Sequence, residues 1–577
     1  MLVVRRSSAR MLSTAMHKVA PAVAPPTTAP KKQSPFRPAS SEWERWESAF
    51  TAATELDYGR MTYAESVSAL KDLVKTGLVS YTDLRDNPSR FFAAHRLLAR
   101  RAVKHGPGFW IRFTVNYNLC YGSVLALGSD EQVRELEADQ KEGRVGCFAL
   151  TETFAGVQSG LVVKTKAVLD DDEFVLTSPD SGAQKFWISQ GLTADKAVVV
   201  ADLEVDGESK GPHAFLLTES LQTLKGVETG DMGLKTTGND LDNAWIRFDG
   251  ARIPKTALLS KYCQISDAGA YSPTHHSVKP FDAIGQRLYT GRVAVAQAAL
   301  AYRRELFDVA RGYAVDKPIP TAPGLEQRTL ASLPQLRELF VNAEEDAHDV
   351  ETFVTCCERR LSPLCQTGEP PDDLLALAVA TAKVRAVEVA LDHCWRLKQD
   401  LGSYSLIADA GFQHLDFLTC CKFAEGDSRI LMQKIARDRL KRGPFLDNEP
   451  PAVQRLVDDL NAKLRSVGDD DKKKGPDLGR RVQTSLRPRQ PRHGRHRRRL
   501  PQRRRSPRPR PRLRNLIYFF RRRRLLPPPL TTSSSSSLLG VVLLLSSSGF
   551  FVTRPLSCFW VGLVARSSCI PSSLTLF

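Results

Sequence analysis

Hydrophobic periodicity divides the chain into three successive patterns. In the first, apolar residues recur three and four positions apart in runs such as SEWERWESAF and YAESVSALKDLVKTG, a spacing that predicts helices. A further helical run covers residues 88–103, and Ser129 with Gln132 forms an S-x-x-Q capping box at a helix start. This pattern predicts an N-terminal helical domain over residues 41–145.

The second pattern is an alternation of β-branched or aromatic residues with polar ones in short runs. These runs, LVVKTKAVL, KAVVVADLEV, PHAFLLT and NAWIRF, are separated by clusters of Asp, Gly, Ser and Pro. Such clusters favour turns between connected strands. We therefore expect a central antiparallel β domain over residues 146–265.

The third pattern returns to helical spacing. A helix of about 25 residues is predicted from Gly291, and a second runs over 373–398. The apolar stripe of the second helix consists of Leu377, Ala380, Val384, Val387 and Leu391. Two more helices, 325–360 and 426–441, complete a predicted C-terminal four-helix bundle over 280–445. The fold class is therefore α+β.

Both ends of the chain differ from this folded middle. Residues 475–577 consist of Arg/Pro runs followed by a stretch rich in Leu and Ser, a composition typical of a disordered basic tail. Residues 1–40 are rich in Arg, Ser and Ala and contain no acidic residue. That composition indicates a mitochondrial transit peptide, with a plastid or peroxisomal location or a merely disordered segment as alternatives.

The net charge of +18 comes from these ends. There are 22 arginines and no acid after residue 479, whereas residues 42–477 hold 53 basic and 64 acidic residues. The folded core is thus acidic, and no nucleic-acid partner is expected for it. No apolar run approaches the roughly 18 residues that span a bilayer, so we expect a soluble protein. Neither zinc-ligand spacing nor a Walker loop is present, and no metal is expected.

Four segments occur in order along the predicted domains. They are GCFALTETFAG (146–156), KFWISQG (185–191), GNDLDNAWIRFDGARIPKTALLSKY (238–262) and AEGDSRILMQKIARDRL (424–440). Together they resemble the acyl-CoA dehydrogenase and acyl-CoA oxidase superfamily over about residues 45–445. The resemblance implies an FAD-dependent enzyme that converts an acyl-CoA thioester to a trans-2-enoyl-CoA.

Removing an α-hydrogen from a thioester requires a general base and stabilisation of the charge that develops on the carbonyl oxygen. The resemblance implies that Glu425 is this base and that Gly426 and Arg292 lie against the substrate. Two other interpretations stay open: Glu425 caps its helix, and Arg292 is a structural ion-pair partner. In some family members the base precedes the arginine, but here Gly291 stands there and cannot accept a proton.

The resemblance also implies two groups of FAD contacts. Near the β domain they are Phe148, Leu150, Thr151, Trp187 and Ser189. The alternative for Trp187 is an ordinary core aromatic, and for Thr151 a strand-end hydroxyl.

In the bundle the implied FAD contacts are Lys317, Gln399, Gly402, Asp427 and Arg429. Here the sequence departs from the family pattern, since Lys317 replaces an arginine and Asp427 a threonine, and a lysine loses the bidentate fork. Asp427 would add negative charge, which Arg429 would offset. These departures favour a divergent subfamily with altered FAD anchoring.

Three functional hypotheses follow. The first is a dehydrogenase that passes electrons to an electron-transferring flavoprotein, and the second is an oxidase that uses O2. The third is a catalytically silent relative that serves as a binding or assembly subunit. A homodimer or homotetramer is expected from the resemblance in each case.

Overall fold

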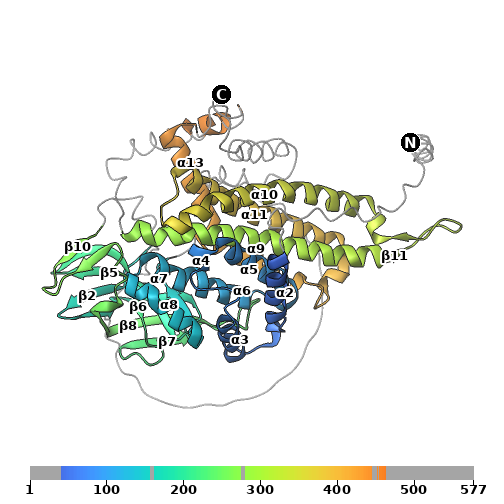
Figure 1. Ribbon diagram of the computed structural model, residues 1–577. Helices are drawn as coiled ribbons and strands as arrows, with labels where there is room; N and C mark the ends of the chain where they lie inside the picture. Colours follow the sequence, from blue (N-terminus) through green and yellow to red (C-terminus); the bar gives the residue numbers. More distant parts are fainter. Residues whose placement is uncertain are drawn as a thin grey trace, which may run out of the picture. The chain divides into compact units, whose positions relative to one another are not determined.

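The computed structural model describes residues 41–155, 162–274, 280–444, 451, 454–459 and 461–462 (Figure 1). Contacts between residues divide the chain into two compact units, Met1–Ser48 and Ala49–Phe577. The predicted transit segment, 1–40, and the predicted basic tail, 475–577, lie outside the described residues. Every predicted site residue belongs to the second unit.

Helices follow one another from Ser41 to Glu142. They are α2 (Ser41–Ala53), η1 (Tyr58–Arg60), α3 (Tyr63–Lys75), α4 (Asp83–Asp86), α5 (Pro88–His105), α6 (Gly108–Thr114), η2 (Val115–Cys120), α7 (Tyr121–Leu127) and α8 (Asp130–Glu142). The predicted capping box is confirmed, since Ser129 Oγ accepts from Gln132 N–H and Gln132 Oε1 accepts from Ser129 N–H. Segment η2 is a π-helix, a rare conformation that often marks a functional site.

Strands replace helices after Gly146. They are β1 (Gly146–Ala149), β2 (Lys166–Asp170), β3 (Glu173–Thr177), β4 (Lys185–Ser189), β5 (Lys196–Val205), β6 (Glu208–Leu217), β7 (Val227–Asp231), β8 (Asn243–Pro254), β9 (Cys263–Ile265) and β10 (Tyr271–Pro273), with short 3-10 turns η3 (Ser181–Ala183) and η4 (Lys255–Ala257). The main sheet has the order β1-β5-β2-β3-β8-β4, with β6 paired to β5 and β7 to β8; β9 and β10 form a separate pair.

The prediction of antiparallel pairing was incomplete. Most pairs are antiparallel, but β1 and β2 both run parallel to β5. Alternation of apolar and polar residues specifies which face of a strand is buried, not the direction of its neighbour, so the pattern could not reveal this. Strand β5 is central, and its residues Ala197, Val199, Ala201 and Leu203 are fully buried in the core of the sheet.

Long helices resume at Pro280. They are α9 (Pro280–Asp316), α10 (Pro334–Thr367), α11 (Asp373–Asp400), α12 (Asp416–Phe423) and α13 (Ser428–Arg442), joined in part by the hairpin β11 (Pro318–Ile319) and β12 (Arg328–Thr329) and by η5 (Leu330–Ser332), η6 (Gly402–Leu406) and η7 (Phe412–His414). Helix α9 begins earlier than predicted. Helix α10 begins later, because the hairpin occupies the preceding segment and Pro334 sits in the first helical turn, where no N–H is needed.

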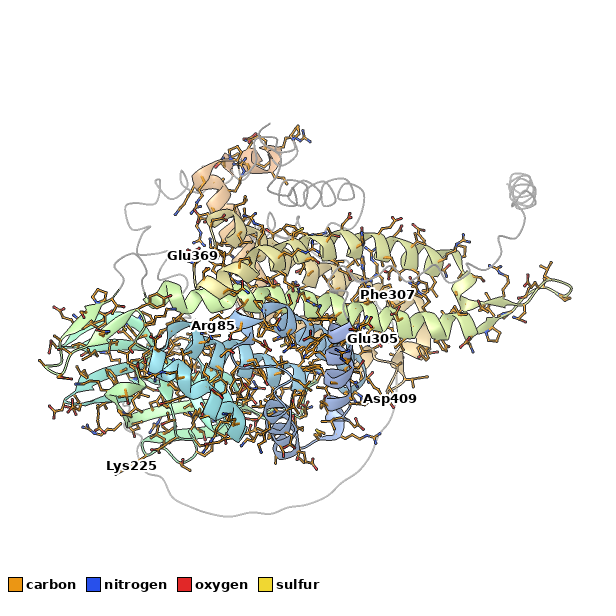
Figure 2. The ribbon with its side chains drawn as sticks, viewed as in Figure 1. Arg85, Lys225, Glu305, Phe307, Glu369 and Asp409 are labelled. Atoms are coloured by element: carbon orange, nitrogen blue, oxygen red, sulfur yellow. The ribbon has the colours of Figure 1, made fainter. Side chains whose placement is uncertain are left out.

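Helices α9, α10 and α11 lie side by side (Figure 1) and enclose an apolar interior. Phe307 on α9 (Figure 2) is fully buried, with its ring 6.0 Å from that of Phe340 on α10 and 6.3 Å from that of His393 on α11. Each pair meets edge to face, the arrangement that aromatic rings favour. Among the described residues, no helix combines the length and the apolar character needed to cross a membrane.

Candidate active site

Glu425 lies in a short turn between α12 and α13. Its φ is +55° and that of Gly426 is +94°, so both residues adopt left-handed backbone, which is rare for a residue with a side chain. Strained backbone of this kind is retained where the surroundings enforce it, often at functional sites. The N-cap of α13 is Asp427, whose Oδ1 accepts from Arg429 N–H at 2.7 Å. Asp427 rather than Glu425 therefore caps the helix.

The carboxylate of Glu425 lies directly against Gly291 of α9. A Cβ atom added to Gly291 would stand 2.2 Å from Glu425 Cδ, closer than any real contact. Gly291 thus provides the space that the carboxylate occupies. The position at which some family members carry the base is here the surface on which Glu425 rests.

Few polar groups contact the carboxylate. Asn118 of η2 donates from Nδ2 to Glu425 Oε1 at 3.4 Å, and its own Oδ1 accepts from Thr290 Oγ1 at 2.7 Å. Glu425 Oε2 is shielded from solvent and has no hydrogen-bond partner among the described residues. One carboxylate oxygen is thus held in place while the other stays available to accept a proton.

Burial raises the pKa of Glu425 to about 7, against the opposing effects of the positive charges on Arg292 and Lys383 and of the hydrogen bond from Asn118. A carboxylate with a pKa near 7 is about half ionised at neutral pH. General bases are most effective when their pKa lies near the working pH. The electrostatics of this site therefore suit proton abstraction.

Arg292 contacts the backbone of the same turn. Its Nε donates to the carbonyl oxygen of Glu425 at 3.0 Å, and its guanidinium lies 5.2 Å from the centre of the Tyr289 ring. A Cβ atom on Gly426 would come within 3.4 Å of Arg292 Nη2. The structure therefore brings together the three predicted residues Arg292, Glu425 and Gly426, with Arg292 bonded to the backbone carbonyl of Glu425 rather than to a carboxylate.

The predicted flavin segments of the β domain also lie side by side. The carbonyl oxygen of Thr151 accepts from Phe186 N–H at 2.9 Å. Beside this contact, Lys185 Nζ donates to Glu152 Oε1 at 2.9 Å and to the carbonyl oxygen of Leu150 at 3.2 Å. Lys185 and Glu152 are both fully buried, so this ion pair joins the end of β1 to the start of β4 inside the protein.

Trp187 is 55% exposed and has a φ of +60°, although it lies in β4 only two residues after the buried Lys185. Its backbone N–H donates to Met232 Sδ at 3.2 Å. Ser189 Oγ accepts from Asn243 Nδ2 at 3.0 Å and keeps its own hydrogen for another partner. The prediction that Trp187 is not an ordinary core aromatic is consistent with this exposure. An exposed indole two residues from a hydroxyl that can still donate fits a planar ring such as the flavin that the resemblance implies.

The π-helix η2 connects these two parts of the site. Asn116 Oδ1 accepts from the N–H of Gly146, the first residue of β1, at 2.9 Å. Two residues later, Asn118 holds the carboxylate of Glu425. A single helical turn thus links Glu425 to the strand that contains Phe148 and leads to Leu150.

Three of the remaining predicted FAD residues lie elsewhere. Lys317, Gln399 and Gly402 are at the end of the bundle where Tyr313 of α9 stacks on Tyr404 of η6, with ring centres 3.6 Å apart. Sixteen residues of α11 separate Gln399 from Lys383 beside Glu425, a span of about 24 Å along the helix. Asp427 and Arg429, by contrast, lie next to Glu425, at the start of α13. Within one chain, the two groups cannot touch the same part of a cofactor.

Sequence reasoning missed Asn118, Thr290 and Lys383. Asn118 and Thr290 carry no sequence signal, because their role depends on the approach of η2 to α9. Lys383 does carry a sequence signal, because it lies on the apolar face of α11, three residues after Ala380 and one before Val384. A charged residue in such a stripe requires buried partners.

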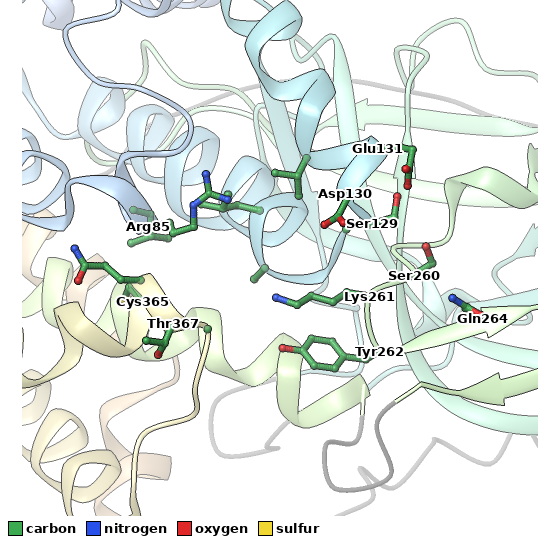
Figure 3. Close-up of a pocket in the computed structure, with 17 residues that line it drawn as sticks. Arg85, Ser129, Asp130, Glu131, Ser260, Lys261, Tyr262, Gln264, Cys365 and Thr367 are labelled. Atoms are coloured by element: carbon green, nitrogen blue, oxygen red, sulfur yellow. The ribbon is translucent and has the colours of Figure 1, made fainter.

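A cavity of about 410 Å³ lies away from these residues (Figure 3). It is lined by the end of α7, the start of α8, the segment around Lys261 and Tyr262, and the end of α10 near Thr367. None of the predicted site residues lines it. In the part of the chain that the structure describes, no cluster of three or more His, Cys, Asp or Glu side chains could hold a metal ion.

Comparisons with known proteins identify sequence relatives, although no protein-family model matches the chain. Acyl-coenzyme A oxidase 3 of Yarrowia lipolytica is 29% identical over 373 residues, which are 58% of this chain and 52% of that protein. The peroxisomal acyl-coenzyme A oxidase 2 of Arabidopsis thaliana is 27% identical over 392 residues, 64% of this chain and 55% of that protein. The chain spans about half the length of these curated relatives.

Solved structures share the fold. Acyl-CoA oxidase 3 of Yarrowia lipolytica has a TM-score of 0.56 and 22% identity, over 70% of this chain and 61% of that chain. Glutaryl-CoA dehydrogenase of Mycobacterium smegmatis has a TM-score of 0.55 and 20% identity, over 71% of this chain and 97% of that chain. Acyl-CoA oxidase-2 of Caenorhabditis elegans, solved with FAD, ascaroside-CoA and ATP, has a TM-score of 0.57 and 22% identity, over 72% and 66%. The sequence relatives are acyl-CoA oxidases and the fold is shared with acyl-CoA oxidases and dehydrogenases, and together they support the acyl-CoA dehydrogenase and oxidase superfamily for this chain.

Proposed function

We propose that this protein oxidises an acyl-CoA thioester to the trans-2-enoyl-CoA, with FAD as cofactor and Glu425 as the base. One observation carries the proposal: the buried carboxylate of Glu425 has a pKa raised to about 7 and an oxygen without a partner among the described residues. A carboxylate of this kind can accept an α-proton at neutral pH.

The surrounding residues would prepare that step. Asn118 holds Oε1 and Arg292 holds the carbonyl oxygen of Glu425, so Oε2 keeps a defined position. The N–H of Glu425 is the proposed donor to the thioester carbonyl, where negative charge develops as the proton leaves. FAD, when bound, supplies the acceptor for the hydride from the β-carbon.

The residues at the end of β1 and in β4 fit the ring system of FAD. Thr151 and Trp187 are exposed next to each other, and Ser189 retains a hydrogen to donate. Phe148 and Leu150 would contribute backbone contacts. Because Lys317, Gln399 and Gly402 lie at the far end of the bundle, we propose that they hold the adenine dinucleotide part of a second subunit's FAD.

Exposed apolar residues support a homodimer or larger homo-oligomer. Val315, Trp395, Leu406 and Ile407 lie at the same end of the bundle as Gly402 and are 48–77% exposed. Neighbouring exposed apolar side chains of this kind often mark protein interfaces. A second subunit that covers them would also place Lys317 and Gln399 beside a bound cofactor.

Two electron acceptors are consistent with the family. A dehydrogenase would pass its electrons to an electron-transferring flavoprotein, and a solved dehydrogenase shares this fold. The curated sequence relatives are named oxidases, which favours O2. We keep the dehydrogenase as the first proposal and the oxidase as the second.

The names of the relatives, rather than the N-terminal composition, are the basis for the proposed cell compartment. The comparisons do not support the predicted mitochondrial location, and two curated relatives are named as peroxisomal. We propose the peroxisome, and imaging the tagged full chain beside peroxisomal and mitochondrial markers would decide between the two.

The full chain provides the functional test. We expect a yellow protein whose flavin absorbance is lost on anaerobic addition of one class of saturated acyl-CoA. Glu425→Gln should slow this reduction by about 100-fold or more, since it removes the base. Glu135→Gln, an exposed change on α8, should leave it unaltered.

Exposure of the reduced protein to air then distinguishes O2 from an electron-transferring flavoprotein as the electron acceptor. Rapid reoxidation with formation of hydrogen peroxide would identify an oxidase, and slow reoxidation a dehydrogenase. A folded protein that neither contains nor takes up FAD would contradict the enzymatic proposal and favour the silent relative.

A further inference from the structure

Lys383 of α11 is a buried lysine that the proposed chemistry does not use. Its side chain is fully inaccessible to solvent. Its Nζ donates to the carbonyl oxygen of Lys422 at 2.8 Å, to that of Gly426 at 2.9 Å, and to Ser428 Oγ at 3.1 Å. These acceptors belong to the end of α12, the turn and the start of α13. One ammonium therefore contacts the chain on both sides of Glu425.

The number of bonds matches the charged form of the side chain. An ammonium has three N–H donors and a neutral amine only two, so only the ammonium can donate to all three oxygens. Glu425 and Gly426 have left-handed backbone, and a turn of this kind needs neighbours that enforce it. Lys383 supplies three such contacts from a long, continuous helix.

Charged and titratable groups approach Lys383 from every neighbouring element. Glu425 and Asp427 lie in the turn, Arg292 comes from α9, and Cys421 from α12. Burial lowers the pKa of Lys383 to about 8, while Cys421, Asp427 and Glu425 oppose this effect. Burial raises the pKa of the Cys421 thiol, so this thiol is neutral at pH 7. At that pH the charge on Lys383 thus faces carboxylates and Arg292.

We propose that Lys383 is a positioning residue: its ammonium holds the turn that presents Glu425 and favours the ionised, proton-accepting form of that carboxylate. This inference rests on the proposed function, because it assigns a supporting role to the same site. Lys383 touches neither substrate nor reacting atoms in this role and acts only through Glu425.

Lys383→Met tests the proposal, because methionine has a similar length and no charge. In anaerobic flavin reduction by an acyl-CoA between pH 5.5 and 9, the parent rate should rise with a midpoint near 7. Lys383→Met should move this midpoint upward by about one pH unit and lower the maximal rate about tenfold or more. Lys434→Met, an exposed change on α13, should leave both unaltered. An unchanged midpoint in Lys383→Met would overturn the proposal.

Lys383→Arg serves if the methionine variant does not fold. Arginine keeps the charge, but its planar fork cannot direct donors at three convergent oxygens as an ammonium does. We expect a midpoint close to that of the parent and a maximal rate about tenfold lower. A parent-like rate in Lys383→Arg would show that the three bonds do not position Glu425.

The free energy of unfolding in urea, measured between pH 5 and 8, tests the coupling between Lys383 and Glu425 without substrate. The folded-state pKa of Glu425 lies above its unfolded value, so its contribution to stability is complete below about pH 4.5 and is lost as pH rises through 7. Glu425→Gln should remove this loss of stability with rising pH. Lys383→Met should shift the loss of stability to higher pH. If no acyl-CoA reduces the flavin, the proposed function fails, while these curves still confirm or contradict the effect of Lys383 on Glu425.

Discussion

At the scale of single residues, the position of Glu425 depends on the absence of a side chain at residue 291. Glu425 Cδ occupies the space that any side chain on Gly291 would need. The glycine costs helix α9 stability, because glycine is less favourable than alanine in a helix interior by about 1 kcal/mol. Such a cost is tolerated when the space is needed, and here the carboxylate needs it.

Gly291→Ala should therefore displace Glu425. A Cβ atom 2.2 Å from Cδ forces the carboxylate or α9 to move, and a shift of about 1 Å can slow a reaction about 100-fold. We expect at least that loss in the rate of flavin reduction by acyl-CoA. The matched control is Gly312→Ala on the same helix, where an added Cβ meets nothing within 4 Å. That variant should keep its activity and gain about 0.5–1 kcal/mol in free energy of unfolding.

At the scale of elements, the site is formed where η2, α9, α11 and the turn before α13 meet. The three helices each contribute a contact: Asn118 of η2 bonds the carboxylate of Glu425, Arg292 of α9 its carbonyl oxygen, and Lys383 of α11 the carbonyl oxygen of Gly426. The turn itself is closed by Asp427, which caps α13. The resemblance predicted a cofactor contact for Asp427, and its hydrogen bond to Arg429 N–H indicates a second role.

The two roles of Asp427 can be separated. Asparagine is as good an N-cap as aspartate, and replacing such a cap by alanine costs about 1 kcal/mol. We expect Asp427→Ala to lower the free energy of unfolding by about that amount in urea, and Asp427→Asn to stay within a few tenths of the parent. If capping is its main role, both variants keep their FAD content. Loss of FAD from Asp427→Asn, with stability intact, would instead indicate a direct cofactor contact.

Local patterns in the sequence predicted the helices and strands well, but they did not predict which of these elements contact one another. The capping box at Ser129 and the run that became β5 could be recognised because each depends on a few neighbouring residues. The parallel pairing of β1 with β5 joins residues about fifty positions apart. Asn118 reaches Glu425 across 307 positions. Contacts of this range leave no periodic trace, so only the fold, or a resemblance that carries the fold with it, can indicate them.

At the scale of the whole molecule, the predicted FAD residues form two groups at opposite ends of the bundle. Phe148, Thr151 and Trp187 lie on the β-domain side, whereas Lys317 and Gln399 lie where α9 and α11 end. One chain can offer each group to a different cofactor. In the proposed assembly, two chains with their bundles together would complete each cofactor site with one group from each subunit, and oligomerisation would then be a condition for FAD binding.

The double variant Leu406→Asp/Ile407→Asp tests this condition. Both side chains are more than half exposed in the single chain, at 77% and 58%, so the change should not disturb the core of the subunit. Buried at an interface, two unpaired carboxylates would oppose association strongly. Sedimentation should give the mass of one subunit, and FAD absorbance per chain should fall about tenfold or more. The control, Val341→Asp on the exposed face of α10, should retain both the assembly and the flavin. A monomeric variant that keeps its full FAD content would show that each chain binds the cofactor by itself, and that Lys317, Gln399 and Gly402 take no part in binding it.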